Sequence, residues 1–154
     1  MKRKRYYIAY GSNLSEEQMK VRCPDARPAG MAVLWDMKLV FRFHATIEPC
    51  IGETVPVLVW EISEADERNL DRYEAFPSYY RKEEKEIQMT SFRGKDPRKI
   101  TAMVYIMNDG RPASTPMKEY YDVLDRAYTR FGFNRALLEK AMEEAKEAEL
   151  HDLS

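Results

Sequence analysis

The sequence predicts an α+β fold in which a small mixed sheet, curled or closed, is flanked by helices. About five or six segments have the composition and periodicity of strands, most of them short and bounded by turn residues. The helical segments between them are too brief to be regular crossovers of a parallel sheet. A length of 154 residues fits one domain, so residues 1–154 are predicted to form a single domain with one core.

The first strand is expected at residues 7–10, led by Arg5 and Tyr6, because this stretch is aromatic and apolar. The Gly-Ser-Asn sequence at residues 11–13 ends it, and Ser15 then begins a helix in a capping box with Gln18. A strand that passes through a glycine turn into a helix start directs free backbone N–H groups toward one point, where a carboxylate or phosphate can bind. An ordinary strand-to-helix turn without a ligand is the alternative interpretation.

The middle of the chain has the strongest strand patterns. Residues 26–30 are expected to be a connector, and residues 31–43 alternate in part, which predicts one bent strand or two. Residues 44–49 are expected to form a loop or short strand, with a turn at Gly52. Residues 55–62 are nearly all apolar, as in a strand covered on both faces.

A second helix is predicted from Ser63, whose segment fits a helix cap, to Tyr73. It should end near Glu74, because Pro77 disfavours helical geometry in the residue before it. Two further strands are predicted at residues 79–89 and 100–107. Two helices follow, one at residues 115–131 that stops at Gly132 and one that begins at Asn134.

The composition excludes several classes of function. Lys plus Arg (25) nearly balance Asp plus Glu (26), which disfavours nucleic-acid and membrane-surface proteins. The basic cluster at residues 2–5 is interpreted as a solvated segment leading into a strand. No apolar run is long enough to span a membrane and no secretory signal is visible, so a cytoplasmic location is expected. Cys23 and Cys50 are too few for a disulfide framework or zinc site, and no metal is expected.

Glu74 is the candidate catalytic residue. It is expected to end a helix, where the negative end of the dipole disfavours another negative charge, and its aromatic neighbours should restrict water. Both effects raise the pKa of a carboxyl group toward the range useful for proton transfer at neutral pH. A surface glutamate at a helix end is the alternative interpretation.

Other catalytic arrangements do not fit. Ser12 lacks the G-x-S-x-G context of a hydrolase nucleophile, and His44 is the only histidine that could serve it as a base. His44 is interpreted as a structural residue that could lie near a cavity. Gly11 stands alone, so neither a phosphate loop nor a dinucleotide fingerprint is present.

Several motifs together resemble the gamma-glutamylcyclotransferase-like family. They are Tyr10-Gly11-Ser12-Asn13-Leu14, residues 45–49 before Gly52, residues 57–60, Leu70-Asp71-Arg72-Tyr73-Glu74, and Tyr80. Their order and spacing agree along roughly four fifths of the chain, and Y-G-S-N-L followed by L-D-x-x-E is more specific than either motif alone.

The resemblance implies a small β-barrel with flanking helices and a cavity at one end. It implies that Glu74 is the catalytic glutamate and that Tyr10, Gly11, Ser12, Asn13 and Leu14 form the loop that holds the α-carboxylate of the substrate through backbone amides. It also places Tyr80 and Tyr120 around the pocket. One position departs from the pattern, because the family commonly has glycine after the glutamate and this chain has Ala75.

The reaction that the resemblance implies is cyclisation of a γ-glutamyl compound to 5-oxoproline with release of a free amine. The attacking amine and the γ-amide carbonyl belong to one molecule, so holding it folded supplies much of the effective molarity, and no cofactor is required. Glu74 would act as base and then as acid. A non-catalytic domain that binds a small carboxylate metabolite is the alternative function, and the leaving amine and a homodimeric state are left open.

Overall fold

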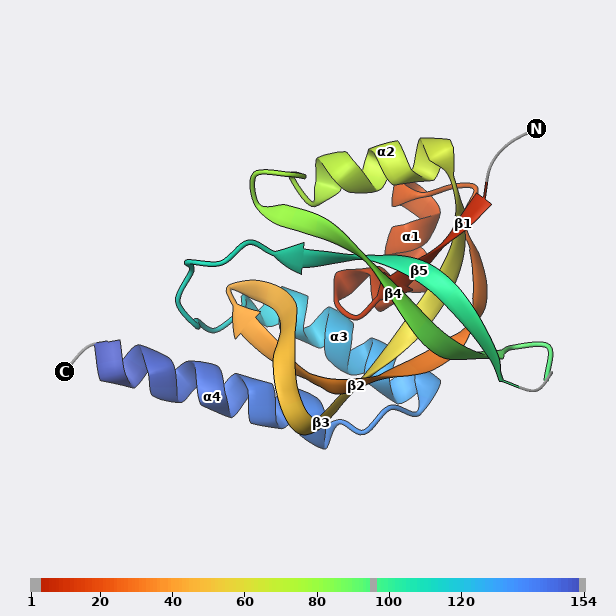
Figure 1. The fold of residues 1–154 in the computed structure, drawn as a ribbon. Helices are drawn as coiled ribbons and strands as arrows, with labels where there is room; N and C mark the ends of the chain where they lie inside the picture. The colour runs from red at the N-terminus through yellow and green to blue at the C-terminus, as the bar shows by residue number, and fades with distance from the viewer. Residues whose placement is uncertain (1–3, 95–96, 153–154) are drawn as a thin grey trace.

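The computed structural model describes residues 4–94 and 97–152, and its sheet closes into a barrel. The elements in chain order are β1 (Lys4–Ala9), the 3-10 helix η1 (Ser12–Leu14), α1 (Glu16–Arg22), β2 (Arg27–Arg42), β3 (His44–Ser63), α2 (Glu64–Tyr73), β4 (Tyr80–Ser91), β5 (Arg98–Met107), α3 (Lys118–Phe131) and α4 (Ala136–Asp152) (Figure 1). The strand order is β1-β3-β2-β4-β5, with β5 returning to β1. The predicted α+β fold with a small mixed barrel and flanking helices is therefore confirmed.

The barrel is mixed because one pairing is parallel. β1–β3, β3–β2, β2–β4 and β4–β5 pair antiparallel, and β5 pairs with β1 in parallel. The closing pairings are short: Tyr6 and Tyr7 register with β5, and Gly30 and Met31 register with β4. Because few backbone bonds join these edges, side-chain packing inside the barrel contributes much of the closure.

The predictions for the β2–β3 region are partly wrong. The segment 26–30 is not a connector, since β2 begins at Arg27, and residues 44–54 belong to a single strand of 20 residues. Gly52 has a positive φ of 89°, yet it lies inside β3, where the register shifts opposite residues 35–37. The backbone N–H of Gly52 donates a hydrogen bond of 2.9 Å to the carboxylate of Asp36. Gly52 therefore forms part of a bulge instead of a turn, and the pairing of β2 with β3 continues on both sides of it.

Gly30 lies where β2 meets β4. A Cβ placed on it would lie 2.3 Å from the backbone oxygen of Thr90 and 2.8 Å from Cγ of Met89. No side chain fits between these backbones. The residue that the sequence assigned to a connector therefore allows the two strands to come together and close the barrel.

The register of β1 against β3 determines where the chain leaves each strand. Lys4 pairs with Ser63 and Ala9 pairs with Leu58, so β1 and β3 end at opposite ends of the barrel. α2 starts directly after Ser63, and its ten residues extend about 15 Å back toward the end at which β1 stops. Figure 1 shows α2 running across the top of the molecule in this way.

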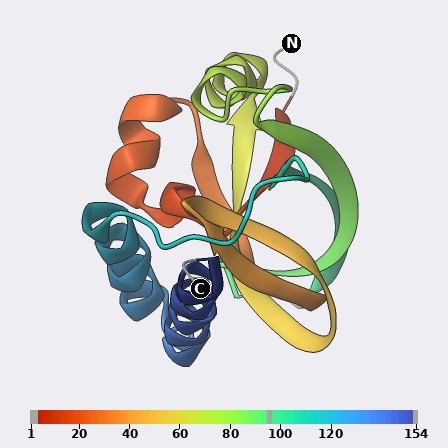
Figure 2. The ribbon, with the colours of Figure 1, turned by 90° about the vertical axis from the view of Figure 1, so that its left-hand side faces the viewer.

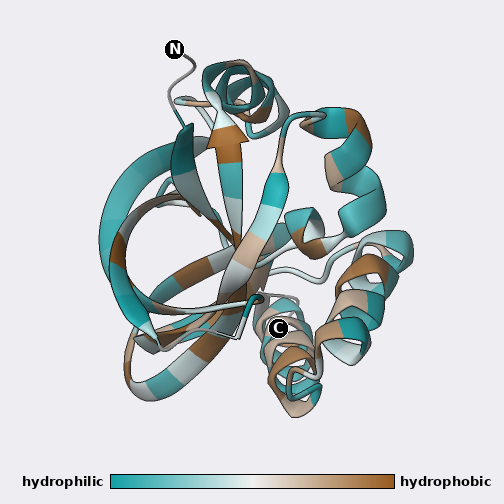
Figure 3. Cartoon of the chain, turned by 90° about the vertical axis from the view of Figure 1, so that its right-hand side faces the viewer, coloured by the Kyte–Doolittle hydropathy of each residue, from teal (hydrophilic) through white to brown (hydrophobic). Residues whose placement is uncertain are grey.

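The helices cover the barrel unequally. α1, α3 and α4 gather on one side and α2 lies over another part of the wall (Figure 2). Bands of apolar and polar residues follow one another along the strands (Figure 3). Buried apolar residues from all five strands and from the helices form one hydrophobic core. Ser63 caps α2, as predicted, and forms a full capping box with Asp66. The capping box predicted for Ser15 and Gln18 is wrong in part, because Ser15 accepts from the N–H of Gln18 but the Gln18 side chain does not reach back. None of the described helices combines the length and apolar character needed to cross a membrane.

Candidate active site

A cavity of about 120 Å³ opens at the end of the barrel where β1 stops. Its wall contains seven tyrosines, His44 and one carboxylate, that of Glu74. The tyrosines are Tyr7, Tyr10, Tyr73, Tyr79, Tyr80, Tyr105 and Tyr120. The remaining lining comes from Gly11, Ser12, Asn13 and Ala45. A single acid thus faces a small space bounded by aromatic rings and by the backbone that follows β1.

Most of the site residues predicted from the sequence meet at this cavity. Glu74, Tyr10, Gly11, Ser12, Asn13, Tyr80 and Tyr120 all line it. Leu14 does not, because its side chain is fully buried in the hydrophobic core. The hydroxyls of Ser12 and Tyr73, which belong to the two distant segments, lie 2.8 Å apart. The carboxylate and the loop after β1 therefore converge on one hollow although they are far apart in the chain.

The loop after β1 forms a 3-10 turn before α1 begins. The N–H of Leu14 donates to the carbonyl of Gly11 and the N–H of Ser15 donates to that of Ser12, both at 3.0 Å. The first N–H groups of such a turn have no acceptor within it. The indole of Trp60 donates to the carbonyl of Asn13 at 3.0 Å and fixes the loop against β3. Backbone N–H groups left free in such a turn are able to bind an anion.

Gly11 lies close to two side chains at the cavity wall. A Cβ on it would lie 3.2 Å from the hydroxyl oxygen of Tyr120 and 3.5 Å from Cβ of Ala45.

Glu74 is the C-cap residue of α2, and its backbone N–H donates to the carbonyl of Leu70 at 2.8 Å. Within residues 4–94 and 97–152 its carboxylate makes no hydrogen bond or ion pair. Burial raises the pKa of Glu74 to about 7, and the positive charge of Arg22 opposes that rise. A carboxyl group with this pKa exchanges a proton readily at neutral pH.

The turn after Glu74 bends through Ala75, which has a positive φ of 49°. Its N–H donates to the carbonyl of Arg72 at 3.2 Å, and the N–H of Tyr79 donates back to the carbonyl of Ala75 at 2.8 Å. The left-handed conformation favours glycine, so a residue with a Cβ is strained there.

Three tyrosine hydroxyls connect the wall of the cavity to backbone groups. Tyr10 donates to the carbonyl of Tyr105 at 2.6 Å, and Tyr80 donates to the carbonyl of Ala45 at 2.7 Å. Tyr120 accepts from the N–H of Ala45 at 3.0 Å. Burial raises the pKa of all three phenols, so they remain protonated at neutral pH.

His44 lies at the cavity, near its rim. Its Nδ1 is 3.0 Å from the hydroxyl of Tyr79, and its ring packs edge-on against Phe43, Tyr79 and Tyr120. Burial lowers the pKa of the imidazole, which keeps it neutral at pH 7. These contacts agree with a positioning role for the ring.

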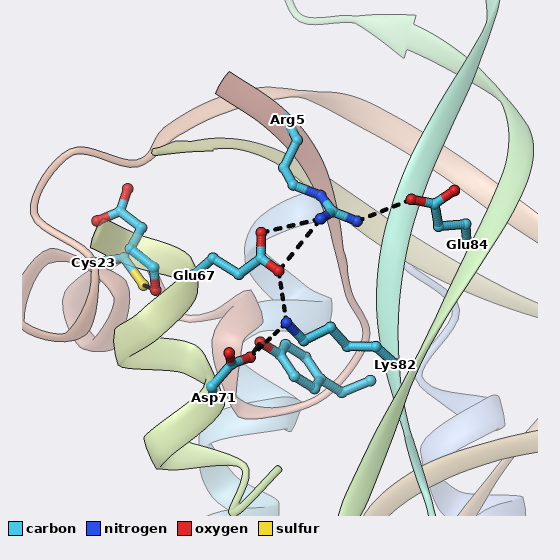
Figure 4. Close-up of polar contacts among 8 residues, drawn as sticks. Arg5, Cys23, Glu67, Asp71, Lys82 and Glu84 are labelled. Carbon is cyan, nitrogen blue, oxygen red and sulfur yellow. Dashed lines mark hydrogen bonds and ion pairs between the residues drawn. The ribbon is translucent and has the colours of Figure 1, made fainter. Parts of the chain in front are cut away.

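A network of charges fixes α2 against the barrel. Lys82 on β4 lies 2.6 Å from Glu67 and 2.9 Å from Asp71, and Arg5 on β1 reaches the other side of Glu67 at 3.2 Å (Figure 4). The hydroxyl of Tyr105 also donates to Asp71. The helix that ends in Glu74 is thereby joined to β1, β4 and β5, and these half-buried pairs restrict its position more than exposed pairs would.

Four lining tyrosines were not identified from the sequence: Tyr7, Tyr73, Tyr79 and Tyr105. Tyr73 and Tyr79 flank the predicted acid, and an extended search of its neighbours would have included them. Tyr7 and Tyr105 lie in strands, where an inward-facing tyrosine is indistinguishable from a core residue until the barrel is closed.

Metal-ligand clusters and reactive thiols would be further sources of chemistry among the described residues. No group of three or more His, Cys, Asp or Glu side chains among them is arranged to hold a metal ion. Both cysteines are free thiols, and burial raises the pKa of Cys23 to about 12, which opposes thiolate formation.

Comparison with known proteins yields one consistent result. A family model described as "Gamma-glutamyl cyclotransferase, AIG2-like" matches residues 7–126. A mouse protein named gamma-glutamylcyclotransferase is 33% identical over 132 residues, which cover 77% of this chain and 66% of that protein, slightly under two thirds. A solved structure named gamma-glutamyl cyclotransferase has a TM-score of 0.68 at 27% identity, and an uncharacterized human protein has a TM-score of 0.67 at 28% identity. Each alignment covers 90% of this chain and 86% of the other.

Proposed function

This chain belongs to the gamma-glutamyl cyclotransferase, AIG2-like family, and we propose that it converts a γ-glutamyl amine or amino acid into 5-oxoproline and a free amine. The observation that carries the proposal is the convergence of Glu74 and the loop at residues 11–13 on one cavity. One feature supplies a group for proton transfer and the other supplies donors for the α-carboxylate of the substrate.

In the proposed reaction, Glu74 accepts a proton from the α-ammonium group of the substrate. The freed amine attacks the γ-carbonyl carbon, a C–N bond forms, and the carbonyl electron pair moves to oxygen. When that pair returns, the bond to the leaving nitrogen breaks and Glu74 returns its proton to that nitrogen. Glu74 then takes the second proton that the ring nitrogen has to lose and passes it to the freed amine, so that a neutral lactam and an ammonium product result. A pKa of about 7 suits both transfers, because neither form of the carboxyl group is strongly favoured at neutral pH.

The cavity contributes orientation. A γ-glutamyl chain has to fold before its amine reaches its own carbonyl, and a space of about 120 Å³ favours compact conformers. Anchoring the α-carboxylate at the loop of residues 11–13 would fix the carbon that bears the amine. Such orientation contributes rate without a covalent enzyme intermediate.

The test is detection of 5-oxoproline by mass spectrometry from a panel of γ-glutamyl amino acids, γ-glutamyl amines and γ-glutamyl peptides. Glu74→Gln removes the proton-transfer group and is expected to abolish release, whereas Glu64→Gln, an exposed position at the other end of α2, serves as the matched control. Unchanged release in Glu74→Gln would refute the assignment. Thermal stabilisation by the panel without 5-oxoproline would instead support a metabolite-binding domain.

A further inference from the structure

The side-chain amide of Asn13 has a fixed orientation. Arg22 donates a hydrogen bond from Nη1 to Oδ1 of Asn13, and an arginine can only donate. The amide oxygen therefore faces Arg22, and the amide nitrogen, Nδ2, faces Tyr7 and donates to its hydroxyl oxygen at 2.8 Å. Asn13 itself is 3% exposed, so no bulk water competes for these positions.

Arg22 is itself held in place. Its guanidinium carbon lies 3.4 Å from the centroid of the Tyr73 ring, and its backbone carbonyl accepts from Nδ2 of Asn69 at 3.0 Å. Stacking on Tyr73 and hydrogen bonds from Nη1 to Asn13 and from Nη2 to Gln18 leave the guanidinium little freedom. The orientation of the Asn13 amide is consequently determined by α1 and α2 together.

The hydroxyl proton of Tyr7 is left without a partner. The oxygen accepts from Asn13, and no acceptor for the proton lies within hydrogen-bond distance among residues 4–94 and 97–152. Tyr7 is 3% exposed and lines the cavity. Burial and the nearby charge of Glu74 raise the pKa of the phenol, so the proton stays on the oxygen.

The other phenols of the wall differ in this respect. Tyr10 and Tyr80 donate their protons to backbone carbonyls, so neither is free to donate to a substrate. Tyr120 accepts from a backbone N–H and is already expected to contact the substrate. Tyr105 donates to Asp71, and the hydroxyls of Tyr73 and Tyr79 pair with Ser12 and with Nδ1 of His44. Tyr7 is the phenol of the wall whose proton has no partner among the described residues and to which no role has been assigned so far.

We propose that Tyr7 is a catalytic residue, whose O–H donates a hydrogen bond to the γ-carbonyl oxygen as the α-amine attacks, and that Asn13 and Arg22 are its positioning residues. This inference rests on the proposed cyclisation. The substrate amine has to reach Glu74 and attack the γ-carbonyl of the same molecule, so a donor that lines the same small cavity as Glu74 is within reach of the carbonyl oxygen. Tyr7 keeps its proton throughout, and all bonds form and break in the substrate and at Glu74.

The first test is Tyr7→Phe, which removes only the hydroxyl. Because the bond strengthens as charge develops on the oxygen, kcat is expected to fall about 10²-fold while KM changes little. Tyr128→Phe is the matched control: Tyr128 is fully buried outside the cavity, and its hydroxyl has no partner among the described residues. A wild-type kcat in Tyr7→Phe would overturn the inference and leave the Glu74 assignment standing, whereas no 5-oxoproline from the wild-type protein would reject both.

The second test reverses the positioning bond. Asn13→Asp keeps the shape of the side chain but offers only acceptors, so the second carboxylate oxygen would accept the Tyr7 proton and turn it away from the cavity. We expect kcat to fall as in Tyr7→Phe and the double variant to fall no further. If the fall in kcat of the double variant equalled the product of the two single falls, the coupling between Asn13 and Tyr7 would be overturned. Circular dichroism of each variant verifies that the fold is retained.

Discussion

The guanidinium of Arg22 lies 3.4 Å from the centroid of the Tyr73 ring, which places a permanent positive charge beside the next residue, Glu74, without an ion pair between them. The charge lowers the pKa of the carboxyl group while burial raises it, and burial is the larger effect. The pKa of about 7 is therefore the result of two opposing influences that can be separated by mutation.

Arg22→Met removes the charge and keeps an apolar side chain against Tyr73. The pKa of Glu74 should then rise above about 7, and the acidic limb of the pH profile of kcat/KM should move to higher pH. Arg68→Met, which removes an exposed positive charge from α2, provides the control. An unchanged limb in Arg22→Met would mean that another group controls the profile.

Glu74→Gln should make the protein more stable at alkaline pH. The carboxyl group has a folded-state pKa of about 7 against an ordinary 4.5, so the folded state binds the proton more tightly and stability falls as pH rises from 4.5 through 7. Above pH 8 the loss is on the order of 3 kcal/mol. Urea unfolding of both proteins at pH 5 and pH 8 tests this: the difference between them should be larger at pH 8, and equal differences would contradict it.

Gly30→Ala should destabilise the barrel, whereas Gly11→Ala should affect the site. At Gly30 the added Cβ meets a backbone oxygen at 2.3 Å, so β2 and β4 have to separate, with a loss of about 1–3 kcal/mol or more. At Gly11 it meets the tip of Tyr120 at 3.2 Å, which can shift, so the expected effect is a higher KM. Urea unfolding and initial rates on both variants give the comparison. Equal stabilities would disprove the tight approach at Gly30.

Ala75→Gly should stabilise the turn that follows Glu74. A residue with a Cβ at a φ of 49° carries a strain of about 1–2 kcal/mol, and the greater freedom of unfolded glycine offsets about 0.5–1 kcal/mol of the gain. The net increase is therefore up to about 1 kcal/mol. Ala65→Gly, at an exposed position in α2, should instead lose about 1 kcal/mol. Opposite signs in urea unfolding distinguish the two positions, and a loss in both would contradict the strain at Ala75.

The sequence predicted the helices better than the long strands. Ser63 and Gly132 are local signals of a helix start and stop, and both act in the structure as predicted. Gly52 is also a local signal, but the ladder between β2 and β3 continues past it through a bulge, because pairing along both strands outweighs one turn residue. Local patterns do not contain that tertiary contribution.

A candidate site residue could be predicted where its place in a helix or strand determines its chemical property. Glu74 was identified because it ends a helix beside aromatic residues, and burial does raise its pKa. Tyr7 and Tyr105 were not identified. They lie on β1 and β5 and line the cavity once these strands pair in parallel, and the sequence does not specify that pairing. Leu14 belongs to the recognised motif but packs in the core.

The antiparallel pairing of β1 with β3 makes the number of residues in α2 a determinant of the position of Glu74. Each residue inserted into a helix advances its end by about 1.5 Å and rotates it by about 100°. One added residue between Ser63 and Glu74 would point the carboxylate away from the cavity while every strand of the barrel kept its register. Any redesign of this protein therefore has to preserve the length of that helix, even where it replaces the side chains on its outer surface.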